Sequence, residues 1–280
     1  MREDFLKRYV NLGCGHRFHA GWTNFDILST APGVIAHDLS RGIPLDDSSS
    51  EVVYHSNVLE HIRREEALPF MRECWRVLRP GGALRVATPD LEQICRLYLT
   101  KLGEAAAGEA QADYDWMMLE LYDQSVRERV GGDMLAYLAQ TPLPNEDFVF
   151  GRIGEEGRSL VRDLQARRAG QRPLPSPRQL WQRLPVWYGR VVTSLLLGRR
   201  GRRAFDIGMF RLEGEVHQWL YDRFSLARLM KAAGFVELAV EPAGRSRVPG
   251  WAGFNLDTLP DGSAVKPDSL FMEGTKPGPK

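Results

Sequence analysis

Two glycines flank one small residue in the segment Val10–Gly15 (Val-Asn-Leu-Gly-Cys-Gly), directly after a short apolar run. Glycine lets the main chain turn tightly and lets a ligand approach the backbone closely. The turn Gly13-Cys14-Gly15 is therefore a candidate binding element for a small molecule. Many α/β proteins begin with such a turn, so its meaning depends on the residues that follow.

Polar residues recur at intervals after this turn, each where an apolar run ends. Further on, a Pro-Gly-Gly turn precedes another apolar run. The segments are Asn24-Phe25-Asp26, His37-Asp38-Leu39, residues 52–61 (Val-Val-Tyr-His-Ser-Asn-Val-Leu-Glu-His) and residues 76–82 (Arg-Val-Leu-Arg-Pro-Gly-Gly). Because ligands of open α/β sheets bind beyond the carboxyl ends of the strands, we expect these residues to line one site.

Short apolar runs alternate with connecting segments over residues 8–90, which predicts a parallel sheet covered on both faces. Only eight residues, His16–Thr23, lead from the glycine turn into the second expected strand, so the first helix is a single turn or absent. Apolar residues at helical spacing predict a helix over 64–78, stopped by Pro80-Gly81-Gly82. The expected strands are Tyr9–Leu12, Thr23–Ile27, Val34–His37, Val52–His55 and Ala83–Thr88.

The strand pattern stops after residue 90 and returns near residue 214. Residues 91–213 are helix-prone and contain a segment rich in proline and arginine. A helix is expected over Ser225–Ala233, ended by Gly234, and strands over Val236–Val240 and Leu270–Gly274. We therefore divide the chain into an α/β domain, residues 1–90 and 214–280, and a helical insertion, residues 91–213.

This series of segments resembles the class I S-adenosylmethionine-dependent methyltransferases, in particular the broad "type 11" group. The resemblance covers roughly residues 1–90 and 215–280. It implies a Rossmann-like, doubly wound, mostly parallel seven-stranded sheet with an antiparallel last strand. The helical insertion would then follow the fifth strand and form a lid or substrate region.

The resemblance also implies where S-adenosylmethionine binds. The segment from Asn11 and Leu12 through Gly13-Cys14-Gly15 would pass under the methionine part of the cofactor. Asp26 would accept hydrogen bonds from the ribose hydroxyls, for which a carboxylate is suited. The structural alternatives are that the two glycines form only a turn and that Asp26 caps a surface element. Cys14 is interpreted as a small packing residue.

Two further pairs complete the implied cofactor site. Asp38 and Leu39 would meet the adenine, and Ser56 with Asn57 would line the methionine end. Asp38 also suits an Asx turn. A dinucleotide-dependent dehydrogenase is disfavoured, because Phe18 stands where its third glycine is required.

Methyl transfer to a hydroxyl needs a base to remove the hydroxyl proton. Most of the remaining lowering of the barrier comes from alignment of the acceptor, the methyl carbon and the sulfur. The candidate bases are His217, Asp90 and His61, and His55 is a weaker one. Each histidine has a structural alternative as a packed, hydrogen-bonded residue, and Glu60-His61 is interpreted as structural. We expect no metal site, since the acidic pair Asp46-Asp47 suits a solvated turn.

The net charge of +1 hides an asymmetry in the insertion. Residues 158–203 contain twelve arginines, no lysine and one acid, Asp163, a net charge of +11 that leaves −10 for the rest of the chain. Leucine, tryptophan and tyrosine alternate with these arginines. The pattern suits an interfacial helix, phosphate recognition, or a solvated cap that packs on the sheet domain.

Three functions are consistent with the sequence. The first is an S-adenosylmethionine-dependent O-methyltransferase whose acceptor is a sugar, a glycan precursor or another small molecule, anionic or lipid-linked. The second is a non-catalytic binding module that docks through the insertion, and the third is an RNA methyltransferase, disfavoured because no nucleic-acid motif accompanies the charge. Three cysteines without metal spacing and no long apolar run favour a cytoplasmic protein, with peripheral membrane contact through residues 158–203.

Overall fold

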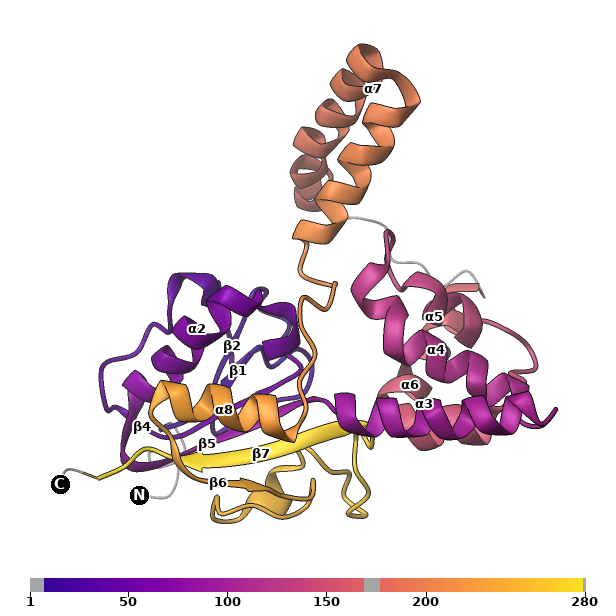
Figure 1. Cartoon of the computed structure of the whole chain (residues 1–280). Helices are drawn as coiled ribbons and strands as arrows, with labels where there is room; N and C mark the ends of the chain where they lie inside the picture. Colours follow the sequence, from indigo (N-terminus) through magenta and orange to yellow (C-terminus); the bar gives the residue numbers. More distant parts are fainter. Residues whose placement is uncertain (1–7, 169–176, 279–280) are drawn as a thin grey trace.

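The computed structural model describes residues 8–168 and 177–278, which form a seven-stranded sheet and seven α-helices (Figure 1). The strand order is β3-β2-β1-β4-β5-β7-β6. Strands β1 to β5 run parallel, and β7 runs antiparallel to both β5 and β6. The strands are β1 (Tyr9–Leu12), β2 (Thr23–Asp26), β3 (Val34–Ala36), β4 (Ser50–Ser56), β5 (Leu78–Pro89), β6 (Val236–Val240) and β7 (Ser269–Thr275). The predicted mostly parallel, Rossmann-like sheet is confirmed.

Helices α2 (Arg64–Val77) and α8 (Arg223–Ala233) pack together on one face of the sheet. Their apolar residues join those of the central strands in the largest buried cluster, which includes Leu12, Leu84 and Met230. Asp222 caps α8 through a capping box with Ser225. This cluster fixes the register of β1 and β4, whose ends carry the candidate site.

The opposite face is covered by an irregular segment, residues 241–264. It contains one short 3-10 helix, η3 (Trp251–Phe254). Trp22, Tyr54 and Trp251 form an aromatic cluster there, with ring centroids 5.2–6.4 Å apart. Aromatic bulk thus fills the layer that a helix would otherwise occupy.

No helix connects β1 to β2 in the described chain, as the short spacing predicted. Residues 13–22 form turns instead, one closed by a hydrogen bond from the Arg17 N–H to the Cys14 carbonyl. The strand expected at Ala83–Thr88 begins earlier, at Leu78, because α2 ends at Val77 and the Arg-Pro-Gly-Gly segment continues directly into β5. Gly81 donates to the Lys276 carbonyl and so extends the sheet.

Helices α3 to α6 surround a separate apolar cluster that includes Trp116, Met117 and Val149. They lie beside the carboxyl end of β5 (Figure 1). Their bounds are α3 (Leu91–Ala106), α4 (Gln111–Val126), α5 (Gly132–Leu138) and α6 (Glu146–Arg168). The division into two folding units stays a prediction.

The next element, α7 (Pro177–Leu212), bends at Gly198 into a helical hairpin that projects from the molecule (Figure 1). Gly189 lies against the Phe205 ring, and Arg190 forms an ion pair of 2.5 Å with Asp206, so the two halves are in contact. No described helix is both long and apolar enough to cross a membrane. The segment 213–222 then returns from the hairpin to the sheet.

Candidate functional site

The glycine turn at the carboxyl end of β1 has the backbone conformation that its sequence predicted. Gly13 and Gly15 have φ values of +62° and +54°. A Cβ on Gly13 would lie 2.4 Å from a methyl carbon of Val58, whereas one on Gly15 would meet open space. Gly13 is therefore required by both backbone angle and packing, and Gly15 leaves room above the main chain.

Asp26 closes this turn from the end of β2. The Gly15 N–H donates to its Oδ2 at 2.8 Å, and the Leu28 N–H donates to Oδ1 at 3.3 Å. Each carboxylate oxygen has two acceptor sites, so one on each stays available for a ligand hydroxyl. The turn and the acid thus form one unit, although Asp26 as a ribose ligand stays a prediction.

Asn11 and Leu12 lie beneath the turn. The Asn11 side chain is buried and donates to the Arg17 carbonyl at 3.2 Å, and Leu12 is fully buried in the core. Arg17 in turn donates to the Asn255 carbonyl. The side chains of Asn11 and Leu12 therefore hold the loop, and any contact with a cofactor would come from their backbone.

Exposed apolar side chains lie next to Asp26 and were not singled out from the sequence. Ile27 and Leu28 are 69% and 67% exposed. An aromatic base lying beyond β2 would cover such side chains and remove their apolar surface from water. Their position directly after Asp26 is the signal that could have identified them.

The adenine pair predicted at the end of β3 has a mixed outcome. Asp38 caps the 3-10 helix η1 (Leu39–Arg41), and its Oδ1 accepts the Ser40 N–H at 3.0 Å, the turn role considered as its alternative. This hydrogen bonding to Ser40 lowers the pKa of Asp38. Leu39 is partly buried against the main core. Contact of either residue with an adenine stays a prediction.

Ser56, Asn57 and Cys14 lie at the ends of the central strands β4 and β1. The Asn57 N–H donates to the Ala87 carbonyl, and φ at Asn57 is +52°, so the chain turns sharply here. Ser56 donates to Oδ1 of Asn57 at 3.3 Å. Burial raises the pKa of the Cys14 thiol to about 11, so Cys14 is a packing residue and not a thiolate nucleophile.

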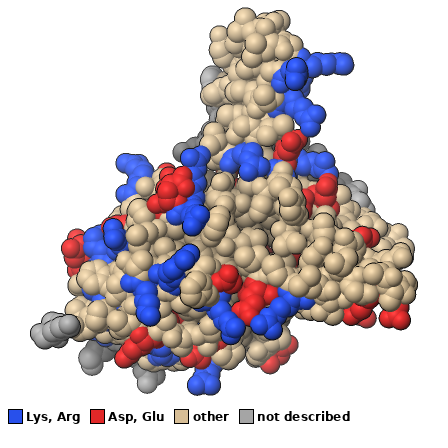
Figure 2. Space-filling model, viewed as in Figure 1, with Lys and Arg blue, Asp and Glu red and all other residues tan. Residues whose placement is uncertain are grey.

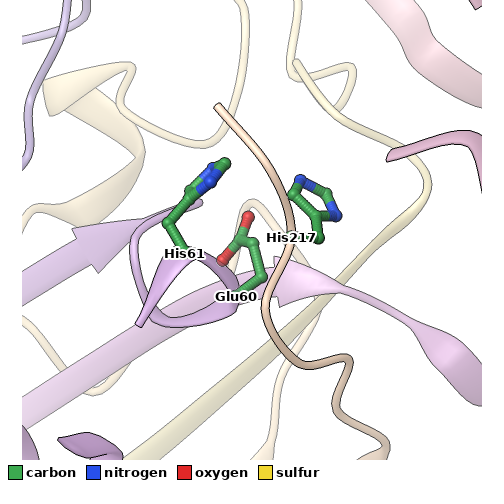
Figure 3. A group of neighbouring side chains, drawn as sticks. All are labelled: Glu60, His61 and His217. Carbon is green, nitrogen blue, oxygen red and sulfur yellow. The ribbon is translucent and has the colours of Figure 1, made fainter. Parts of the chain in front are cut away.

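Three side chains that could do chemistry meet at the same edge of the sheet: Glu60, His61 and His217 (Figure 3). Glu60 and His61 lie on the 3-10 helix η2 (Leu59–His61), which follows β4. The His61 and His217 ring centroids are 4.8 Å apart. One ligand-type atom from each of the three residues lies within 4.8 Å of the other two.

The segment 213–222 brings His217 to this edge across more than 150 residues of sequence. The Gln218 N–H donates to the Glu60 carbonyl at 2.7 Å, and the Leu91 N–H donates to the Tyr221 carbonyl. The His217 N–H donates to the Gln124 carbonyl of α4. This segment, rather than the α7 hairpin, therefore lies over the carboxyl ends of β4 and β5.

Burial sets the charges of this cluster. It lowers the pKa of His217 to about 3 and also lowers the pKa of His61, so both rings are neutral at pH 7. It raises the pKa of Glu60 to about 7. A neutral imidazole has a lone pair available for a proton or a cation.

The other two candidate bases do not join the cluster. Asp90 caps α3, and its Oδ1 accepts the N–H groups of Glu92 and Gln93. His55 is fully buried and packs edge-on against Phe70, with ring centroids 5.3 Å apart. His55 is therefore packed, as its structural alternative predicted, but its ring nitrogens have no hydrogen-bond partner among the described residues. The Asp90 carboxylate caps α3.

Part of the chain is similar to known proteins. Residues 12–86 match the family described as "Methyltransferase domain". The chain is 43% identical over 56 residues to a probable S-adenosylmethionine-dependent methyltransferase of Mycolicibacterium smegmatis (strain ATCC 700084 / mc(2)155). This alignment covers 20% of the present chain and 21% of that relative, so the chain spans about a fifth of its length.

The solved structures that the chain is similar to are distant in sequence. A methyltransferase from Thermotoga maritima, described as a possible histamine N-methyltransferase, is 12% identical, with a TM-score of 0.37 over 96% of this chain and 82% of its own. A methyltransferase from Archaeoglobus fulgidus is 10% identical, with a TM-score of 0.38 over 98% and 89%. The resemblance of residues 12–86 to class I methyltransferases is thus confirmed by the family match.

Proposed function

We propose that this chain transfers the methyl group of S-adenosylmethionine to an acceptor. The observation that carries the proposal is the Gly13-Cys14-Gly15 turn joined to Asp26 by the Gly15 N–H, at the start of the segment that matches a methyltransferase domain. The exposed Ile27 and Leu28 offer an apolar surface for the adenine. The cofactor would place its methyl group toward the edge that holds Glu60, His61 and His217.

The acceptor atom in this proposal is a hydroxyl oxygen. Its oxygen attacks the methyl carbon, the carbon–sulfur bond breaks, and sulfur keeps the electron pair as S-adenosylhomocysteine forms. The hydroxyl proton passes to a neutral imidazole of His61 or His217, the two candidate bases that lie together. A sugar, a glycan precursor or another small molecule is the proposed acceptor class, which rests on the sequence resemblance alone.

Calorimetric titration with S-adenosylhomocysteine tests cofactor binding. The wild type should bind, and Asp26→Asn should lose affinity about tenfold or more, because the amide repels one of the two donor groups that the carboxylate accepts. Asp261→Asn is the matched control, since Asp261 is an exposed turn carboxylate that accepts Ser263 elsewhere in the molecule. Absence of binding by the wild type would favour a non-catalytic module instead.

The α7 hairpin supports a second proposal, that the protein docks on an anionic membrane surface. Leu195, Leu196 and Leu197 precede the bend at Gly198 and are 80%, 77% and 68% exposed. Arg199 and Arg200 follow the bend directly. In Figure 2 the hairpin shows basic groups along one side and uncharged surface over most of the rest. Apolar side chains beside arginine suit the boundary between lipid headgroups and acyl chains.

Flotation with vesicles tests this docking. The wild type should float with vesicles of phosphatidylcholine and phosphatidylglycerol at low salt and stay in solution with phosphatidylcholine alone. The triple variant Leu195→Ser, Leu196→Ser, Leu197→Ser should lose most of this binding. Equal flotation of the triple variant, or none by the wild type, would contradict the proposal. Tight binding to RNA would indicate the nucleic-acid alternative.

A further inference from the structure

The cluster of Glu60, His61 and His217 contains buried polar atoms without hydrogen-bond partners. Glu60 Oε1 and His61 Nδ1 have none among the described residues. An unsatisfied buried polar atom destabilises the folded chain, so its presence calls for an explanation. The two atoms belong to neighbouring residues whose side chains converge on His217 (Figure 3).

We propose that Glu60, His61 and His217 bind a divalent transition-metal cation. Two imidazoles and one carboxylate are a ligand set that zinc and other first-row metals accept, with positions left open for water or substrate. The three ligand atoms lie within 4.8 Å of one another. Tetrahedral zinc requires about 3.3–3.5 Å between ligand atoms. Side-chain rotations that move these atoms by roughly an ångström would therefore complete the site.

Contacts outside the cluster already orient these ligands. The Thr88 hydroxyl donates to Oε2 of Glu60 at 3.3 Å and leaves Oε1 free. His61 Nδ1 has no hydrogen-bond partner among the described residues and is available to a ligand.

Two cationic side chains influence the cluster, and both have acidic partners. Lys266 lies 2.8 Å from Glu156, and Arg127 pairs with Asp123 at 2.6 Å. Arg127 also pairs with Glu215 at 2.9 Å. These acids offset the positive charge that would otherwise oppose a metal ion at this edge.

The proposed cation would also take part in the methyl transfer, and this part of the inference rests on the proposed methyltransferase function. An acceptor hydroxyl bound at an open position would release its proton to solvent at lower pH. Its oxygen would then form the bond to the methyl carbon while the carbon–sulfur bond breaks and sulfur keeps the electron pair. With the cation bound, the hydroxyl proton would no longer have to pass to His61 or His217, which would hold the metal instead.

Titration of the metal-free full-length protein with Co²⁺ tests the site without any activity assay. We expect visible absorption that saturates at one Co²⁺ per chain and is lost when Zn²⁺ is added in competition. His217→Ala and Glu60→Gln should each weaken binding about tenfold or more. Asp46→Asn, which removes an exposed carboxylate outside the cluster, should bind as the wild type does.

Several results would contradict metal binding by Glu60, His61 and His217. Absence of a saturating signal in the wild type would do so without any variant, and so would equal Co²⁺ affinity in wild type and in folded His217→Ala. Circular dichroism identifies a variant that fails to fold, in which case the conservative His217→Gln replaces it. S-adenosylhomocysteine binding is measured separately in the presence of chelator, so failure of the metal site and failure of the cofactor site are distinguishable.

Discussion

The sheet domain and the α7 hairpin use the same residue types in opposite ways. Leu12 and Leu84 of the sheet are fully buried, whereas Leu195, Leu196 and Leu197 of the hairpin are largely exposed. Arg85 is buried between two acids, while Arg190 pairs with Asp206 at the surface. The apolar and charged side chains of the sheet therefore stabilise its fold, whereas those of the hairpin are available for contact with another molecule.

The largest difference in the free energy of unfolding between the two regions should come from substitution of their arginines. Arg85 donates to Asp257 at 2.7 Å and to Glu273 at 2.8 Å, with all three side chains buried. Arg85→Met would remove the buried cation shared by both acids, of which Asp257 would keep the Tyr54 hydroxyl and Glu273 would keep Arg247. We expect a loss of about 3–5 kcal/mol in the free energy of unfolding. Arg190→Met should cost about 0–1 kcal/mol. Urea denaturation measures both, and similar losses would erase the contrast.

Acid should destabilise the sheet domain through His55. Burial lowers its pKa to about 3, whereas an unfolded chain protonates near 6.5. Stability is therefore complete above pH 6.5 and falls as the pH drops toward 3, by ~2 kcal/mol at pH 5. His55→Leu should reduce this fall between pH 7.5 and 5 in urea denaturation and leave the share that the buried His61 and His217 contribute, whereas exposed His16→Gln should not reduce it. The hairpin contains no histidine, so it contributes nothing of this kind.

Glycines with positive φ should differ between the two regions. Gly13→Ala combines a φ of +62° with a contact of 2.4 Å to Val58, so we expect a cost above the ~1–2 kcal/mol of the backbone angle alone. Gly198→Ala, with a φ of +64° and open space, should cost only that backbone amount. Adding Val58→Ala to Gly13→Ala should recover part of the loss, and absence of recovery would refute the packing explanation.

The smallest effect is expected at the exposed leucines. Leu196→Ala should change the free energy of unfolding by less than about 0.5 kcal/mol, because the side chain is 77% exposed. Leu84→Ala is the matched control in the sheet, and should cost about 2–5 kcal/mol. Chemical denaturation compares the two variants, and a large loss at Leu196 would show that the hairpin leucines pack.

The sequence predicted the sheet well because its central strands, such as β1 and β4, are buried on both faces and therefore read as apolar runs. The alternation of short apolar runs predicted the bounds of β1 to β3 to within one residue, and the short connection between the first two strands predicted at most a single helical turn there. β5 was set too short, because Pro80 and Gly81 are ordinarily turn residues and here continue the strand. Pairing with the chain around Lys276 compensates for them.

The candidate site was predictable only where its residues are local in sequence. The glycine turn and Asp26 lie close together and were found as a pair. Glu60 was interpreted as structural, because nothing near it in sequence shows that segment 213–222 returns to its backbone. Such long-range contacts follow from the whole fold, so a cluster with His217 could not be derived from spacing alone.

A crystal structure of the complex with S-adenosylhomocysteine tests the central claim most directly. The account predicts the ligand along Gly13-Cys14-Gly15, its ribose hydroxyls on Asp26 and its sulfur facing Glu60, His61 and His217. A ligand in the groove of about 630 Å³ between α7 and the α4–α5 helices, lined by Arg127, Arg203 and Asp206, would contradict it. A ligand-free glycine turn at saturating concentration would contradict it as well.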